Sequence, residues 1–250
     1  MVSVKFNVAT RELSLKIVYC GPPFSGKTTN VRALHRALRS SQRGRLMSLD
    51  TADDRTLFFD MLPLAFSVAH GSVSPFTLRV RVFSVPGQLV HATTRKVVLQ
   101  GADGVVFVAD SRLEQTQANA QSFAELRDHL AALGPSSRSL PITIQFNKRD
   151  LAEIRSDEEL DVLARESDEP VFPAVALSGD GVRETFLASV AGVWEYLDRR
   201  GQLTADLGLG AEHALDALAQ TLGWPIDLAT CVAASVGGSF IRPELHPWTT

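Results

Sequence analysis

Cysteine is scarce in this chain of 250 residues, and long apolar runs are missing from it. The two cysteines, Cys20 and Cys231, are too few for a disulfide framework, which makes a reducing cytoplasm the expected location. No apolar stretch approaches the roughly 18 residues that a transmembrane helix needs. The first residues also lack the apolar core of a signal peptide.

A large excess of charge of either sign is missing as well. The net charge is −3, so neither a nucleic acid nor an anionic membrane is predicted as a partner. Residue 2 is Val rather than the Gly that myristoylation requires, and the final His-Pro-Trp-Thr-Thr is not a prenylation box, so no lipid anchor is expected. With 45% apolar and 21% charged residues, the composition is that of an ordinary globular protein.

A phosphate-binding motif is present near the start of the chain. Residues 21–28 read Gly-Pro-Pro-Phe-Ser-Gly-Lys-Thr, which has the G-x-x-x-x-G-K-[ST] spacing of a P-loop. Gly21 and Gly26 let backbone N–H groups point at an anion. Lys27 is expected to reach the β- and γ-phosphates, and Thr28 to offer its hydroxyl to Mg²⁺. The motif indicates a bound nucleotide without distinguishing a kinase, an ATPase and a GTPase.

A second motif selects the base. Residues 147–150 read Asn-Lys-Arg-Asp and follow a strand-like run at 141–146, about 120 residues after the P-loop. The carboxylate of Asp150 can accept two parallel hydrogen bonds, from the N1–H and the exocyclic amine of guanine, a pair of donors that adenine lacks. Asn147 is expected to bond the purine edge, and the Lys148 stem to cover the ring. The tetrapeptide could also be a surface turn, but its position predicts guanine specificity.

The alternation of apolar and helical patterns predicts the fold. Strands are expected at 13–20, 76–85, 104–110, 141–146 and 171–177, and helices at 29–39, about 113–133, 157–166 and 182–199. This order predicts an α/β protein with a doubly wound, mostly parallel sheet that binds ligands at the carboxyl ends of its strands. One connection reads instead as an antiparallel hairpin, from 66–70 through 71–75 to 76–85.

Residues 53–60 are the first of two candidate loops that could sense a third phosphate and Mg²⁺. Thr56 could complete the Mg²⁺ shell. Arg55 is placed to act as an arginine finger supplied from within the chain. The alternative is that Arg55 simply pairs with Asp53 or Asp54 on the surface.

The second candidate loop is Ser-Val-Pro-Gly-Gln at 84–88. Gly87 would bond the γ-phosphate through its N–H, and Gln88 would orient the attacking water. An ordinary turn at Pro86 and Gly87 is the alternative.

Several segments together resemble the MglA-type small Ras-like GTPases of bacteria, over about residues 3 to 200. They are the P-loop, Arg-Thr-Leu-Phe-Phe-Asp at 55–60, Val-Pro-Gly-Gln at 85–88, Asp-Gly-Val-Val-Phe-Val-Ala-Asp-Ser at 103–111, and Asn-Lys-Arg-Asp at 147–150. The resemblance implies a P-loop NTPase that binds GTP or GDP with Mg²⁺ and hydrolyses GTP in cell polarity or motility. It also implies a roadblock-type, MglB-like activating protein, downstream effectors, and recruitment to a cell pole or the inner membrane surface by partners.

The family pattern also assigns residues. Arg55 and Gln88 would carry catalysis, and Thr28 and Thr56 would hold Mg²⁺. Residues 174–182 resemble the family's last nucleotide-binding turn, where the N–H of Ala176, with Leu177 beside it, is expected to meet the guanine oxygen. The full set of implied nucleotide contacts is Gly21, Phe24, Ser25, Gly26, Lys27, Thr28, Thr29, Thr56, Gly87, Asn147, Lys148, Asp150, Ala176 and Leu177.

Position 84 departs from Ras-like proteins at large. Ser84 stands where those proteins have an Asp that holds a Mg²⁺-bound water, although MglA-type proteins usually carry a small hydroxyl residue here. Loss of this carboxylate is expected to weaken Mg²⁺ binding and to leave the metal to the phosphates, Thr28 and Thr56.

The last 50 residues differ in composition from the rest of the chain. Residues 201–250 carry one arginine against five acidic residues. Residues 211–222 read as an amphipathic helix, and Asp227 could cap a second helix through Ala234. We expect a GTPase domain at 1–200 and a helical extension at 201–250, which docks on the domain or a partner, or packs permanently on the domain.

Two alternative functions follow from these observations. Ser84 and the extension favour a guanine-nucleotide-bound interaction scaffold that hardly turns over. A nucleoside or small-molecule kinase would share the P-loop, but the guanine motif and the absence of an arginine-rich lid argue against it.

Overall fold

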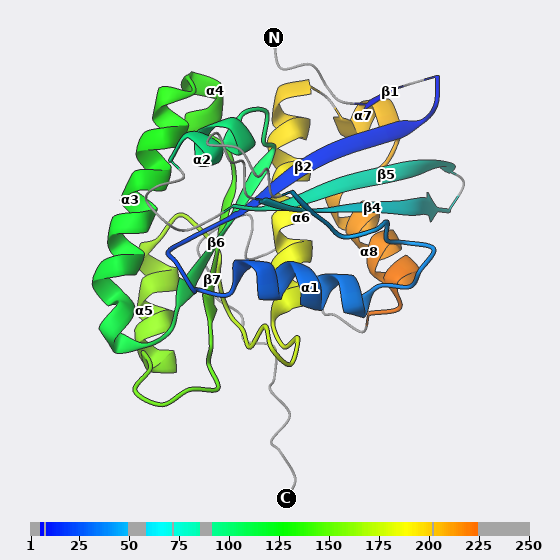
Figure 1. Cartoon of the computed structure of the whole chain (residues 1–250). Coiled ribbons are helices and arrows are strands. Elements are labelled where there is room, and N and C mark those ends of the chain that lie inside the picture. Colours follow the sequence, from blue (N-terminus) through cyan, green and yellow to red (C-terminus); the bar gives the residue numbers. More distant parts are fainter. Residues whose placement is uncertain are drawn as a thin grey trace, which may run out of the picture.

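The computed structural model describes residues 6–7, 9–49, 59–71, 73–85, 92–201 and 203–224. In this part of the chain, eight strands form one sheet in the order β3-β4-β5-β2-β6-β7-β8, with β1 paired to β2 (Figure 1). The strands are β1 (Phe6–Asn7), β2 (Glu12–Cys20), β3 (Met47–Leu49), β4 (Phe59–His70), β5 (Val73–Ser84), β6 (Gly104–Asp110), β7 (Ile142–Asn147) and β8 (Val171–Pro173).

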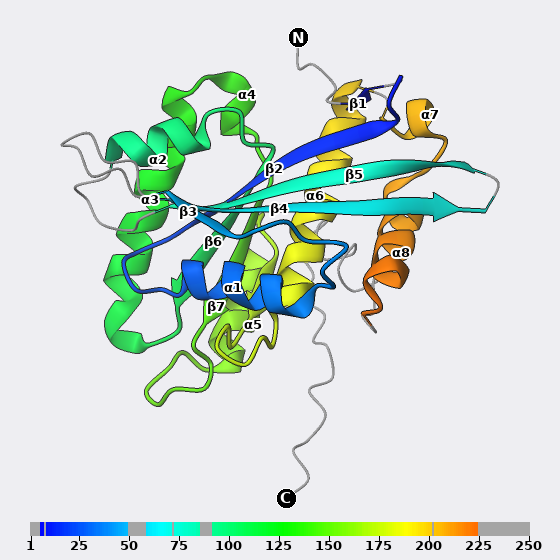
Figure 2. The same ribbon diagram turned by 45° about the vertical axis from the view of Figure 1, so that its right-hand side comes forward.

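Helices cover both sides of the sheet. They are α1 (Lys27–Ala37), α2 (Ala92–Leu99), α3 (Thr116–Ala132), α4 (Pro135–Arg138), α5 (Asp157–Glu166), α6 (Val182–Gly201), α7 (Leu203–Leu207) and α8 (Ala211–Leu222), with a 3-10 turn at Leu113–Gln115. α6 packs on α1, on α8 and on β6 and β7, and both α1 and α8 pack on β4. α3 packs on β6 and α5 on β8. The two groups lie on opposite sides of the sheet (Figures 1 and 2). The arrangement confirms the predicted doubly wound, mostly parallel α/β fold.

The buried strands follow the apolar pattern of the sequence. β5, β2, β6, β7 and β8 are parallel neighbours. Every residue of β6 is buried, as expected for a strand that helices cover on both faces. β6 and α5 have the predicted bounds. β8 ends at Pro173 rather than at 177, because the chain turns there and the N–H of Val175 bonds the carbonyl of Asp180 at 2.9 Å.

The predicted antiparallel hairpin is present, but its first strand is longer than expected. β4 begins at Phe59 instead of 66 and pairs with β5 along most of its length. Leu62, Leu64, Phe66 and Val68 alternate into the core. Pro63 interrupts the sequence signal, yet a proline is tolerated near a sheet edge, and its carbonyl accepts a bond from the N–H of Gly44 at 2.8 Å. Residues 59 and 60 therefore belong to a strand and not to a loop.

The described part of the C-terminal extension packs on the sheet. α8 has the predicted bounds, and its apolar side, including Leu215, Leu218 and Leu222, is buried against β4 and α6 (Figure 2). Thr221 Oγ1 donates to the carbonyl of Ser67 in β4 at 3.2 Å. The buried Trp224 meets Phe186 of α6 edge to face at 6.4 Å between centroids. The second helix predicted at 227–234 lies outside the described residues.

Candidate functional site

The predicted nucleotide motifs meet at one edge of the sheet. The P-loop connects the carboxyl end of β2 to α1, the Asn-Lys-Arg-Asp segment follows β7, and the turn at 174–182 follows β8. Parallel strands bring their carboxyl ends to the same edge, which is where doubly wound proteins bind ligands. The topology therefore gathers segments that lie up to about 150 residues apart in the chain.

Two P-loop glycines cannot be replaced without strain. Gly21 has φ +138°, and a Cβ there would lie 2.2 Å from the carbonyl oxygen of Val108. Gly26 caps α1 with φ +100°, and a Cβ there would lie 2.2 Å from Nδ2 of Asn147. Both positions need a backbone conformation that favours glycine and a neighbour that approaches closely. The P-loop is consequently packed against the segment that is predicted to read the base.

Lys27 is held inside the P-loop. Its ammonium donates to the carbonyls of Gly21 at 3.0 Å and Pro22 at 2.6 Å. Burial lowers the pKa of Lys27 to about 8, because a buried ammonium has lost much of its hydration. An anion placed at this ammonium would be bound by a charge-assisted hydrogen bond.

Asn147 joins the P-loop to the base loop. Its Nδ2 donates to the carbonyl of Ser25 at 2.8 Å, and its Oδ1 accepts from the N–H of Ala176 at 2.8 Å. All three residues are buried, so these bonds are shielded from water. One side chain thus fixes the distance between the phosphate loop and the purine turn.

That bond changes the expectation for Ala176. Because its N–H already bonds Oδ1 of Asn147, Ala176 would have to exchange that bond to meet the guanine oxygen. We therefore move this expected contact to the next N–H, that of Leu177. The side chains of Leu177 and Phe24 are 76% and 83% exposed, which places apolar surface at the rim of the site.

Lys148 and Asp150 follow Asn147 at the end of β7. Lys148 has φ +68°, and its ammonium donates to Oδ2 of Asp110 at 2.6 Å. Burial of the Asp110 carboxyl opposes its ionisation, but hydrogen bonds from Arg112 and Lys148 outweigh burial and lower its pKa. Asp150 is exposed, so its carboxylate is accessible to a ligand. Sequence reasoning gave Asp110 no role, although it anchors Lys148.

A carboxylate surrounded by hydroxyl groups lies beside the P-loop. Oδ2 of Asp60 accepts from Thr28 Oγ1 at 2.8 Å and from Ser84 Oγ at 2.9 Å. Its Oδ1 accepts from Ser48 Oγ at 2.6 Å. Sequence analysis included Asp60 in a switch loop but assigned it no contact. Oxygen atoms of hydroxyls and carboxylates are the ligands that Mg²⁺ prefers, so this side of the site fits the predicted metal.

Four predicted residues lie outside the described part of the chain. They are Arg55 and Thr56 in the first candidate switch, and Gly87 and Gln88 in the second. The strands that lead into and out of these segments are described: β4 begins at Phe59, and β5 ends at Ser84. Thr29 lies in the first turn of α1, directly after Thr28.

Among the described residues, no helix is both long enough and apolar enough to cross a bilayer.

Comparison with known proteins identifies the family. No family model matches the chain. The chain is 42% identical over 182 residues to the mutual gliding-motility protein MglA of Myxococcus xanthus (strain DK1622), and the alignment covers 73% of this chain and 91% of that protein. Identity at this level over nearly the whole relative agrees with the motifs and the fold described above. The chain therefore belongs to the MglA family of small Ras-like GTPases, which use GTP or GDP with Mg²⁺ and hydrolyse GTP.

Proposed function

We propose that this chain is a molecular switch in which GTP and Mg²⁺ order the two candidate switch segments, one around Arg55 and Thr56 and one around Gly87 and Gln88, and hydrolysis releases them for a partner to read. The observation that carries the proposal is the Asn147 bridge, which ties Ser25 of the P-loop to Ala176 of the purine turn. A single nucleotide would occupy both segments, with its phosphates at one and its base at the other.

The proposed binding contacts fall into two groups, one to the phosphates and one to the guanine base. Lys27 and the N–H groups around Gly21 and Gly26 bind the phosphates. Lys148 covers the purine ring, and Asp150 accepts from its N1–H and amine. Leu177 replaces Ala176 as the donor to the guanine oxygen, for the reason given above. Selectivity for guanine then depends on the pair of hydrogen bonds to Asp150.

The proposed catalytic groups come from the two switch segments. Thr28 and Thr56 hold Mg²⁺, which neutralises charge on the phosphates when it is bound. Gln88 orients a water for attack on the γ-phosphate, while the N–H of Gly87 and the guanidinium of Arg55 stabilise the charge that develops on the transferred group. Arg55 would act as an arginine finger from within the chain.

We further propose a role in motility or cell polarity, because the name of the Myxococcus relative refers to gliding motility. The partner that stimulates hydrolysis would be a roadblock-type, MglB-like protein that moves Arg55 and Gln88 into place. Downstream effectors would bind the GTP form, and partners would recruit it to a cell pole or the inner membrane surface.

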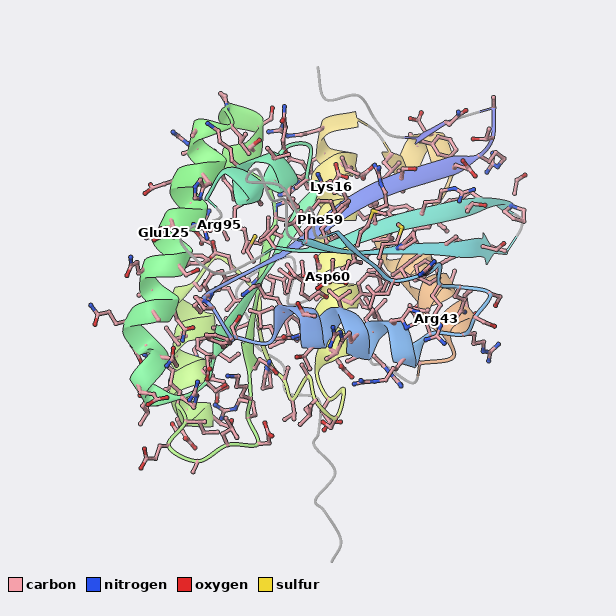
Figure 3. All side chains as sticks on the ribbon, viewed as in Figure 1. Lys16, Arg43, Phe59, Asp60, Arg95 and Glu125 are labelled. Carbon is pink, nitrogen blue, oxygen red and sulfur yellow. The ribbon has the colours of Figure 1, made fainter. Side chains whose placement is uncertain are left out.

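Single-turnover hydrolysis of Mg²⁺·GTP, with and without a roadblock-type protein from the same genome, tests the proposal. We expect slow intrinsic turnover and an acceleration of about a hundredfold or more, since an arginine finger moved into place contributes about 10³–10⁵ in rate. Lys27→Ala should abolish tight nucleotide binding. Its matched control is Lys16→Ala, a lysine of the preceding strand whose ammonium bonds the carbonyl of Gln100 (Figure 3).

Ser84 favours one alternative, a nucleotide-bound scaffold with little turnover, because position 84 carries a serine instead of the Asp found there in Ras-like proteins at large. Tight GTP binding without acceleration by any roadblock-type partner would support the scaffold and contradict the switch. Micromolar or tighter binding in Lys27→Ala would contradict the P-loop assignment common to both.

A further inference from the structure

The carboxylate missing from position 84 has a counterpart on the neighbouring strand. In the antiparallel pairing of β4 and β5, Asp60 and Ser84 are direct partners. Ser84 Oγ donates to Oδ2 of Asp60 at 2.9 Å. The side chains of direct partners point to the same face of a sheet. A carboxylate on Asp60 therefore reaches the region that a carboxylate on residue 84 would reach.

Asp60 also contacts the P-loop residue that is proposed to hold the metal. Its Oδ2 accepts from Thr28 Oγ1 at 2.8 Å. A hydroxyl has one hydrogen to donate and two lone pairs to offer. When Thr28 donates its hydrogen to Asp60, its lone pairs remain available for a cation. The bond to Asp60 thus orients the Thr28 oxygen for metal binding and does not compete with it.

The carboxylate of Asp60 is held at both of its oxygens by hydroxyl groups. Its Oδ1 is held by Ser48 Oγ of β3 at 2.6 Å, so hydroxyls from three elements fix both oxygens. Within the described ranges no lysine or arginine forms an ion pair with it. Figure 3 shows Asp60 next to α1, at the centre of the molecule. A half-buried anion held in this way is suited to a cation and its bound water.

We propose that Asp60 supplies the outer-shell carboxylate of the Mg²⁺ site, in place of the Asp that Ras-like proteins carry at the position of Ser84. Asp60 accepts hydrogen bonds from Thr28 and from a metal-bound water. Ser84 has become a donor that holds Asp60 in position. The inference rests on the proposed GTPase function, and it reverses the expectation that Ser84 leaves the site one carboxylate short.

The test measures release of a fluorescent GDP analogue at a series of free Mg²⁺ concentrations. In the unaltered chain, Mg²⁺ should slow release with a defined midpoint. Asp60→Asn, which preserves the shape of the side chain, should raise that midpoint by about 10–100-fold, the usual effect of losing an outer-shell partner. Release in excess chelator should stay unchanged, because it does not involve the metal. Glu12→Gln, a carboxylate paired with Arg79 elsewhere on the sheet, is the matched control.

A swap of the two positions sharpens the test. Asp60→Ser should raise the midpoint, and Asp60→Ser combined with Ser84→Asp should return it toward that of the unaltered chain. A swapped chain no better than Asp60→Ser alone would overturn the claim that the two positions are interchangeable. An unchanged midpoint in Asp60→Asn, or an equal change of release in chelator, would overturn the metal role. Absence of any GDP binding in the unaltered chain would instead overturn the proposed function itself.

Discussion

The purine side and the phosphate side of the site hold their side chains differently. On the purine side, Asn147 bonds two backbone groups, and Lys148 bonds the buried carboxylate of Asp110. On the phosphate side, Lys27 bonds carbonyls of its own loop, and Thr28 bonds Asp60 at the start of β4. On the proposed assignment, the purine-side hydrogen bonds join protein groups to one another and need not break when a base binds. The Lys27 bonds involve the ammonium that we propose contacts phosphate.

On the proposed assignment of contacts, this difference makes the purine side the preorganised half of the site. A site whose contacts are already in place loses less conformational freedom on binding. The purine side can therefore contribute affinity for GTP and GDP alike. The phosphate side must exchange internal bonds for bonds to the ligand, and so it is where the third phosphate can alter the protein. Asp60 of β4 and Ser84 of β5, which lie next in the chain to the two candidate switches, contact each other on this side.

The largest expected effect lies on the phosphate side. Arg55→Ala should lower partner-stimulated hydrolysis by about 10³–10⁵-fold, because it removes an arginine finger. GTP affinity should change little, since the guanidinium acts on charge that develops during the reaction. Single-turnover hydrolysis with the roadblock-type partner measures this effect. Arg43→Ala is the control, because Arg43 bonds His35 in the last turn of α1, at the end of the helix away from the P-loop (Figure 3). Unchanged stimulated turnover in Arg55→Ala would rule out the internal finger.

The next effect lies on the purine side. Asp150→Asn should lower GTP affinity by about 10²–10⁴-fold, since each of two hydrogen bonds to a carboxylate contributes about 1.5–3 kcal/mol. Xanthine nucleotides should gain affinity, because a carbonyl replaces the guanine amine and can accept from the new amide. Competition binding with GTP and XTP gives both values. Asp157→Asn, which removes a nearby exposed partner of Arg149, should change neither, and a retained GTP preference in Asp150→Asn would exclude Asp150 as the base reader.

The free energy of unfolding of nucleotide-free variants compares the purine side and the phosphate side of the site directly. Asn147→Ala should lower the free energy of unfolding by about 1–3 kcal/mol, because it leaves the Ala176 N–H and the Ser25 carbonyl buried without this partner. Thr28→Val should lower it less, since Asp60 keeps its bonds from Ser48 and Ser84. Urea unfolding of the nucleotide-free chains measures both. Equal losses, or a larger loss in Thr28→Val, would contradict the view that the purine side is the preorganised half.

The smallest effect is a dependence on pH. The pKa of Lys27 is about 8 in the free chain, and a bound phosphate raises it by favouring the charged ammonium. Binding therefore takes up a proton above about pH 8, and affinity for GDP should fall as pH rises through this value, by at most about tenfold per pH unit. Calorimetry in two buffers of different ionisation enthalpy measures the uptake. Lys27→Arg keeps its charge and should lose this uptake; uptake that persists would assign the proton to another group.

Much of the fold could be predicted because it depends on local patterns. The apolar run of β6 and the amphipathic patterns of α5 and α8 indicated their bounds correctly. The beginning of β4 could not be found in the same way, because Pro63 interrupts the pattern of a strand whose pairing partner is needed to define it. α2 was also missed, since Ala92–Leu99 carries little periodic signal of its own.

The sequence by itself determined the type of chemistry. The P-loop spacing, the Asn-Lys-Arg-Asp segment and the resemblance to MglA-type proteins predicted the nucleotide, the metal and the family, because these depend on residue type and short-range order. Tertiary structure alone decided which groups have partners. The register of β4 against β5 places Asp60 beside Ser84. The side chain of Asn147, at the end of β7, accepts from the N–H of Ala176 in the turn after β8, which is why we propose Leu177 for the purine contact. Such contacts join residues far apart in the chain, and no local pattern records how strands align.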